Sequence, residues 1–165
     1  MNLSVLLIEI GILLAGFSVL VFGMLLISPL TFISDYPPEI QAEYYRSQHK
    51  EAAKAKLTKL MVAKKLLAVV AFLFLFAWML HLAGAETFWQ GLGLTWVYML
   101  SVFAWDTFFL DWVLFANVKR VRLPGTEHMD REYHQKWFHV KVCLPVVPFA
   151  VLAGFISSGL MLWIW

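Results

Sequence analysis

Four long apolar runs constrain the fold of this chain more than any other feature of its sequence. They cover about residues 3–27, 66–85, 91–116 and 142–165. Each run has about 20 residues or more, which lets a helix cross a hydrocarbon core of about 30 Å. The runs lack the polar and apolar alternation of membrane β-barrel strands. The sequence therefore predicts an all-α polytopic membrane protein, with a single transmembrane domain built as a four-helix bundle.

Composition agrees with a membrane location. Hydrophobic residues make up 61% of the chain and its mean hydropathy is +0.74, whereas soluble domains are about 45–50% apolar. The first run has no basic residue before it and is longer than the apolar core of a signal peptide. We therefore interpret it as a retained transmembrane helix.

The basic residues predict the orientation of the chain. All 13 Lys and Arg lie in two segments, about 30–65 and 117–141, and none lies near either terminus. The positive-inside rule places both segments in the cytoplasm, as helical loops, and both termini outside the cell membrane. Because these residues flank apolar runs and are mixed with acids, they do not indicate nucleic-acid binding.

Five lysines lie close to the second run and can contact anionic lipid headgroups, although they also serve simply to set topology. They are Lys54, Lys56, Lys59, Lys64 and Lys65.

Four ionisable residues lie at membrane depth, where a charge is costly and needs a partner or a polar path. They are Glu9, His81, Asp106 and Asp111. At 1.5 Å per helical residue, Asp106 lies roughly 22 Å from the outer end of its helix, and Asp111 about 30 Å. Asp111 is thus expected near the inner boundary, where a basic partner is available, and Asp106 within the membrane.

The two aspartates are predicted to face different sides of their helix. Five positions at 100° per residue leave a net turn of about 140° in an α-helix. Thr95 and Asn117, each 11 residues from Asp106, share its predicted face instead. This sparse polar stripe suggests a narrow path for an ion or a proton.

Glu9 and His81 lie at similar depths near the outer ends of their helices. They are predicted to form either a titrating Glu–His pair or a shallow structural contact.

The segment that follows Thr126 contains candidate metal ligands. If it forms one helix, His128, Glu132 and His139 share a face, but His128 and His139 are too far apart for one ion without a further ligand. The alternative is a solvated helix of mixed charge. Cys143, the single cysteine, excludes an internal disulfide or a CxxC pair and is interpreted as a packed residue.

Two stretches, LDWVLFANVKRVRLPGTEHM and SDYPPEIQ, resemble a family of small bacterial four-helix integral membrane proteins with no known activity. The resemblance covers about a third of the chain. It implies a bacterial membrane protein and singles out six residues on the cytoplasmic side. They are Asp111, Trp112, Pro124, Gly125, Thr126 and Glu127.

Three functions remain open at this point. The first is ion- or proton-coupled transport, or a channel, with Asp106 in the path. The second is a membrane-embedded enzyme that acts on a lipid or isoprenoid at the inner leaflet, and the third is an accessory or scaffold subunit. The candidate catalytic residues are Asp111, Glu127, His128 and His134. The sequence leaves the substrate, any cofactor and any homo-oligomer undetermined.

Overall fold

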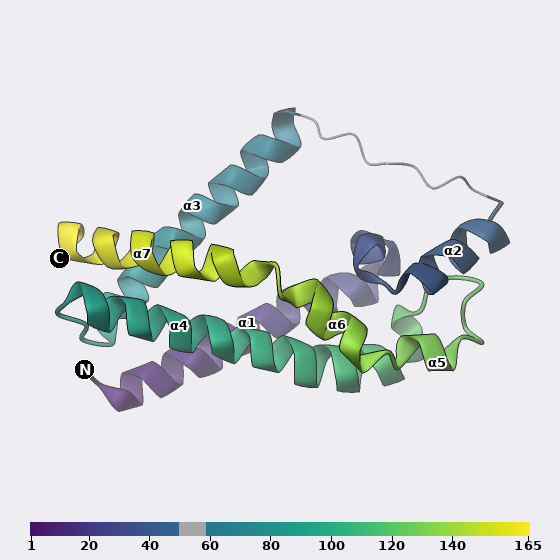
Figure 1. Cartoon of the computed structure of the whole chain (residues 1–165), viewed down its shortest axis with the longest axis horizontal. Coiled ribbons are helices and arrows are strands. Elements are labelled where there is room, and N and C mark those ends of the chain that lie inside the picture. Colours follow the sequence, from purple (N-terminus) through teal and green to yellow (C-terminus); the bar gives the residue numbers. More distant parts are fainter. Residues whose placement is uncertain (50–58) are drawn as a thin grey trace. The chain divides into compact units, whose positions relative to one another are not determined.

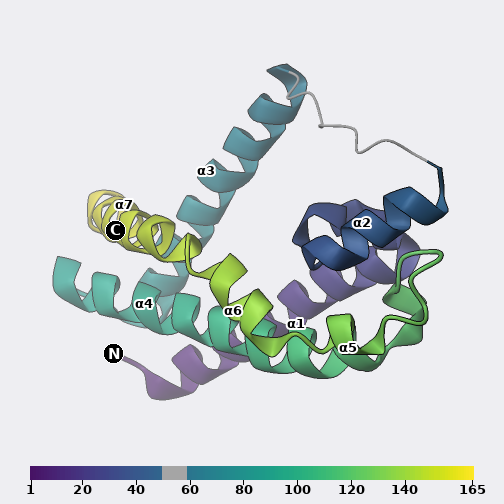
Figure 2. The same cartoon turned by 45° about the vertical axis from the view of Figure 1, so that its right-hand side comes forward.

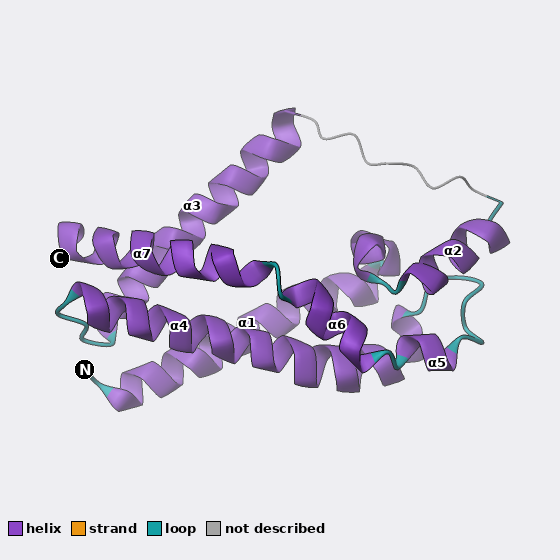
Figure 3. Cartoon of the chain, in the orientation of Figure 1, coloured by secondary structure: helices purple, strands orange, loops and turns teal. Residues whose placement is uncertain are grey.

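The computed structural model describes residues 1–49 and 59–165, and these residues form helices without a β-strand (Figures 1 and 3). The long helices are α1 (Leu3–Ile27), α3 (Lys59–Leu82), α4 (Phe88–Trp105) and α7 (Val146–Ile164). A π-helix, η2 (Asp106–Phe115), continues α4. The shorter elements are η1 (Pro29–Asp35), α2 (Pro38–Ser47), η3 (Lys119–Val121), α5 (Asp130–Tyr133) and α6 (Lys136–Cys143).

The predicted fold class is confirmed. Four helices are long and apolar enough to cross a membrane, and α4 with η2 counts as one of them. In the most apolar 18-residue stretch of each of these helices, only 6–22% is buried. Most of their apolar side chains therefore face outward. That exposure suits lipid, because a soluble surface seldom carries such large apolar patches. Both predicted loops contain helices, since α2 lies in the first and α5 and α6 lie in the second.

Local signals in the sequence explain where the helices begin and end. The Asn2 carboxamide accepts hydrogen bonds from the backbone N–H groups of Ser4 and Val5 and so caps α1. Gly84, with φ of +74°, follows the end of α3. At the start of α4, the Gln90 side chain accepts from the Thr87 N–H while the Thr87 hydroxyl accepts from the Gln90 N–H. This reciprocal arrangement is a capping box.

The chain divides into two compact units, which are described separately. The first contains residues 1–12, the described part of 54–101, and 146–165. Within it, each of the four long helices contacts at least one of the others. The Ser157 hydroxyl of α7 donates to the Leu73 carbonyl of α3 at 3.1 Å. Tyr98 of α4 packs near Phe76 of α3 and donates its hydroxyl hydrogen bond to Glu9 of α1.

Small residues let α4 and α7 approach closely. A Cβ atom added to Gly91 would lie 2.9 Å from the Ser158 hydroxyl oxygen, whereas one added to Gly93 would meet nothing within 4 Å. Ser158 has little room to move, because its hydroxyl is buried and donates to the Gly154 carbonyl at 2.7 Å. Close packing through small residues is how membrane helices associate without a hydrophobic driving force.

We expect Gly91→Ala to be less stable than Gly93→Ala by about 1–3 kcal/mol, the usual cost of overpacking. Both substitutions gain the same helix propensity in the same helix, so their difference isolates the contact with Ser158. Thermal unfolding of the two variants in detergent measures it. Equal stabilities would show that α4 and α7 are not in contact at Gly91.

The second unit contains residues 13–53, of which 13–49 are described, and 102–145. In this unit α6 packs against η2, the continuation of α4 (Figure 2), and α2 contacts α5. Its core is aromatic. The rings of Tyr36 and Tyr133 contact Phe115, with centroids 4.9 and 5.6 Å away. The Tyr36 hydroxyl donates to the Val121 carbonyl at 2.6 Å, which ties η1 to η3.

Polar contacts hold the loop RLPGTEH, residues 122–128, in this unit. The buried Arg122 guanidinium donates to the Glu127 carbonyl at 2.7 Å and forms an ion pair with Asp130. That pairing lowers the pKa of the Asp130 carboxyl. Gly125, with φ of +84°, lies against Ser47, whose hydroxyl oxygen would be 2.4 Å from an added Cβ. Polar contacts therefore fix the loop that separates η2 from α6.

Candidate functional site: an acidic cavity at the π-helix

The π-helix changes the relation between Asp106 and Asp111. In η2 the backbone hydrogen bonds join residues five apart, as in the bond from the Ala116 N–H to the Asp111 carbonyl. Residues i and i+5 therefore lie one above the other, whereas an α-helix separates them by about 140°. The prediction that the two acids face different sides was wrong, because it assumed α-helical geometry throughout.

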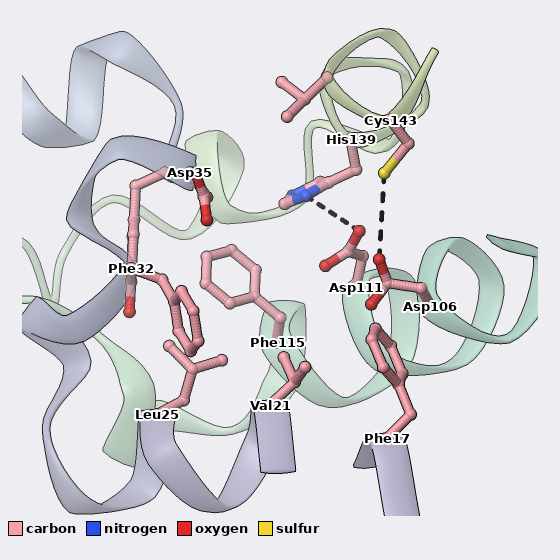
Figure 4. Close-up of a pocket in the computed structure, with 12 residues that line it drawn as sticks. Phe17, Val21, Leu25, Phe32, Asp35, Asp106, Asp111, Phe115, His139 and Cys143 are labelled. Atoms are coloured by element: carbon pink, nitrogen blue, oxygen red, sulfur yellow. Dashed lines mark hydrogen bonds and ion pairs between the residues drawn. The ribbon is translucent and has the colours of Figure 1, made fainter. Parts of the chain in front are cut away.

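Both acids line one cavity of about 240 Å³ in the second unit, which we call the acidic cavity (Figure 4). Its polar lining comes from η1 and the residue that follows it, from η2 and from α6. The polar or ionisable side chains are those of Asp35, Tyr36, Asp106, Asp111, His139 and Cys143. The remaining wall is apolar and comprises Phe17, Val21, Leu25, Phe32, Phe115 and Val142.

Two contacts join α6 to η2 across this cavity. The His139 imidazole Nδ1 lies 3.2 Å from a carboxylate oxygen of Asp111. The Cys143 thiol lies 3.9 Å from a carboxylate oxygen of Asp106 and is oriented to donate to it. Figure 4 shows the two acids side by side on η2, with His139 and Cys143 reaching toward them from α6. Each acid therefore faces its own partner on α6.

Three potential ligand atoms cluster tightly. One carboxylate oxygen each of Asp106 and Asp111 and the sulfur of Cys143 all lie within 4.8 Å of one another. His139 adds a nitrogen donor beside them. Its side chain is only 8% exposed, and its Nε2 is buried without a hydrogen-bond partner among the described residues. A buried polar atom without a partner costs free energy, so its retention calls for an explanation.

The charge in the cavity is unbalanced. Three carboxylates line it, from Asp35, Asp106 and Asp111, and the described lining contains neither Lys nor Arg. His139 supplies a positive charge only when it is protonated. The cavity therefore has an electrostatic preference for a cation.

Three predicted catalytic residues lie apart from this cavity. His128 and His134 are exposed, and the His134 Nδ1 lies 2.6 Å from the Asp130 carbonyl of its own helix. The Glu127 carboxylate accepts from the Gly125 N–H. Asp111 alone among the four candidates lines the acidic cavity.

The predicted metal set of His128, Glu132 and His139 is not brought together. It required one helix from Thr126 onward, but α5 has only four residues and a new helix, α6, begins at Lys136. His139 consequently pairs with Asp111. Among the described residues, the group that could hold a metal ion is Asp106, Asp111 and Cys143.

The other polar residues that the sequence analysis singled out also have partners different from those predicted. Thr95 and Asn117 donate to the Gly91 and Val113 carbonyls of their own helical turns, and neither lines the acidic cavity. The predicted Glu9–His81 pair is not formed. Glu9 instead accepts the Tyr98 hydroxyl, and the exposed His81 ring stacks on Trp165 with centroids 4.8 Å apart.

Among the cavity residues that can be charged or bind a metal, sequence reasoning missed Cys143 and Asp35. Cys143 was interpreted as a packing residue, although His139 and Cys143 have the i,i+4 spacing that places two side chains on one helix face. That spacing was a usable signal. Asp35 lies in a 3₁₀ segment after α1, and nothing in its local sequence links it to residues about 70 positions later.

Comparison of this chain with protein-family models, with curated proteins and with solved structures gives no match. The resemblance to small bacterial membrane proteins therefore stays a prediction, and the function must be argued from the site.

Proposed function

We propose that this chain is a small integral membrane protein that binds a cation in the acidic cavity and moves it as part of ion- or proton-coupled transport. The observation that carries the proposal is the convergence of Asp106 and Asp111 on one cavity through the π-helix. Intramembrane acids usually mark ion or proton pathways. Local π-helical segments inside α-helices are also frequent at functional sites.

The position of the acids in the chain supports a site toward the cytoplasmic face. Both belong to the last ten residues of the span Phe88–Phe115, and the basic segment 117–141 follows directly. With the positive-inside rule, this segment is cytoplasmic and both chain termini are outside. The cavity then lies in the inner half of the membrane.

The same orientation puts the lysines at the start of α3 near the inner headgroups. Lys59, Lys64 and Lys65 are exposed, as binding to anionic lipid requires. Lys54 and Lys56 lie outside the described residues.

Flux in proteoliposomes tests the proposed function. We expect wild-type protein to move protons or a metal cation in response to an imposed gradient, read with an internal fluorescent indicator. Asp106→Asn should reduce the rate at least about tenfold, because it removes a charge that binds the cation. Glu9→Gln is the matched control, since Glu9 is also a buried acid of an apolar helix but does not line the acidic cavity. Flux that is equal in wild type and Asp106→Asn would refute the proposal.

A second candidate is an enzyme that acts on a lipid or isoprenoid at the inner leaflet. The observation in its favour is the Asp111–His139 pair, in which a carboxylate orients an imidazole whose other nitrogen accepts or donates no hydrogen bond among residues 1–49 and 59–165. The apolar wall of the cavity suits a hydrocarbon substrate. Mass spectrometry of a lipid extract incubated with wild type and with His139→Gln tests it. New products that depend on His139 would favour the enzyme, and a scaffold subunit would show neither flux nor turnover.

A further inference from the structure

The donor atoms of the acidic cavity have the composition of a transition-metal site. Two carboxylate oxygens and one sulfur lie within 4.8 Å of one another, and an imidazole lies 3.2 Å from one of the carboxylates. Oxygen, sulfur and nitrogen donors together are those with which proteins bind Zn²⁺ and neighbouring divalent ions. We propose that Asp106, Asp111 and Cys143 bind a divalent transition-metal ion, with His139 as the fourth ligand or as the group that orients Asp111. This inference rests on the proposed cation-binding function and names its cation.

The charge of the ligands favours a divalent cation. With both aspartates ionised and the thiol neutral, the three ligands carry a charge of two negative units in a mostly apolar cavity. When the ion binds, a metal–sulfur bond forms, the S–H bond breaks and the proton passes to solvent. The three ligands and the ion then carry one negative unit in total. A protonated His139 is the single cationic side chain in the described lining that could otherwise compensate the acids.

The mixed donor set also indicates which ions the site rejects. Mg²⁺ and Ca²⁺ prefer oxygen ligands and take six or more of them. A thiolate and an imidazole favour softer ions such as Zn²⁺, Co²⁺ and Fe²⁺. The buried Nε2 of His139, which has no hydrogen-bond partner in the described part of the chain, is a second observation that points to a ligand. A small rotation of the ring could direct it to a metal, because the imidazole already lines the cavity.

The metal site is tested with Co²⁺ on tag-free, chelator-treated protein in lipid nanodiscs. Because Cys143 is the single cysteine, a thiolate-to-cobalt charge-transfer band in the near ultraviolet reports on this residue alone. We expect the band to appear with one Co²⁺ per chain, to disappear when Zn²⁺ is added, and to persist in excess Mg²⁺. Cys143→Ser should lack the band. Asp106→Asn and Asp111→Asn should weaken Co²⁺ binding at least about tenfold, as the loss of a metal-site residue commonly does.

His128→Ala is the matched control, because His128 is exposed and does not line the cavity. Its Co²⁺ spectrum and affinity should equal those of wild type. A folded wild-type protein without the band, or a band that survives Asp106→Asn and Asp111→Asn unchanged, would overturn the metal site.

The metal site and the transport function can fail separately. Asp106-dependent proton flux in protein that binds no Co²⁺ would overturn the metal site and leave the proposed function intact. Specific Co²⁺ binding without flux would support the metal site and reject transport.

Discussion

Oxidation of the Asp106→Cys variant is expected to link the new thiol to Cys143 in most of the molecules. In the wild type, a carboxylate oxygen of Asp106 and the sulfur of Cys143 lie 3.9 Å apart and face each other from η2 and α6. A disulfide requires two side chains that point toward one another from nearby backbones. The π-helix is what directs residue 106 toward α6. Loss of free thiol and a mass decrease of two hydrogens, measured after mild oxidation in detergent, report the bond.

Phe108→Cys is the control for this experiment. Phe108 belongs to the same π-helix, is 54% exposed and does not line the acidic cavity. It should retain both thiols under the same conditions. Cross-linking that is as fast in Phe108→Cys as in Asp106→Cys, or that is absent from both, would contradict the described packing of η2 against α6.

The second large effect concerns the stability of the metal-free protein. Replacing Asp106 and replacing Asp111 should change this stability in opposite directions. Asp106 faces Asp111, and its hydrogen-bond donor among the described residues is a weak one, the Cys143 thiol at 3.9 Å, so we expect its charge to be repelled more than it is stabilised. Asp106→Asn should therefore stabilise the protein by about 0.5–2 kcal/mol, the range typical of such relief. Asp111 pairs with the buried His139. Asp111→Asn should destabilise it by about 1–3 kcal/mol, because the imidazole loses its charged partner.

Thermal unfolding in detergent with a chelator present measures both effects. The double variant Asp111→Asn/His139→Leu is a useful companion, because removal of both partners should recover part of the stability lost in Asp111→Asn. Destabilisation by Asp106→Asn that equals or exceeds that of Asp111→Asn would show that Asp106 has a stabilising partner and that the charge of the cavity is already balanced.

Hydropathy was sufficient to predict the four helices that are long and apolar enough to cross a membrane. The run predicted at residues 3–27 is α1 (Leu3–Ile27), and the run predicted at 142–165 contains α7 (Val146–Ile164). These predictions succeed because a bilayer requires about 20 apolar residues in a row, a property of the segment alone. Pro145 and Pro148 also explain why the last span begins after a break from α6.

The acidic cavity could be predicted only in part. Asp106 and Asp111 were identified because ionisable groups in apolar segments are unusual, and His139 was identified as a candidate metal ligand with other partners. Their convergence depends on the hydrogen-bond register of residues 106–115, and no sequence signal distinguishes a π-helix from an α-helix there. A difference of one residue in that register moves Asp111 from about 140° away to the same face as Asp106.

The prediction for the segment that follows Thr126 was wrong for a different reason. A continuous helix from Thr126 would have aligned His128 with His139. The chain instead turns at His134 and Gln135, between α5 and α6, while Tyr133 is held in the core by hydrogen bonds of its hydroxyl to Leu123 and Thr126. These contacts join residues on both sides of the Pro124–Gly125 turn. Tertiary packing therefore overrides the local helical pattern.

The shared cation site of Asp106 and Asp111 is tested most directly by carbon NMR of the aspartate carboxyl groups. The chain has four aspartates, Asp35, Asp106, Asp111 and Asp130, so a selectively labelled sample in detergent gives four signals that single Asn substitutions assign. Addition of Zn²⁺ should shift the Asp106 and Asp111 signals together, with one common saturation point, and leave Asp130 unchanged. If Zn²⁺ moves neither signal, or moves only one of the two, the aspartates do not form one cation site.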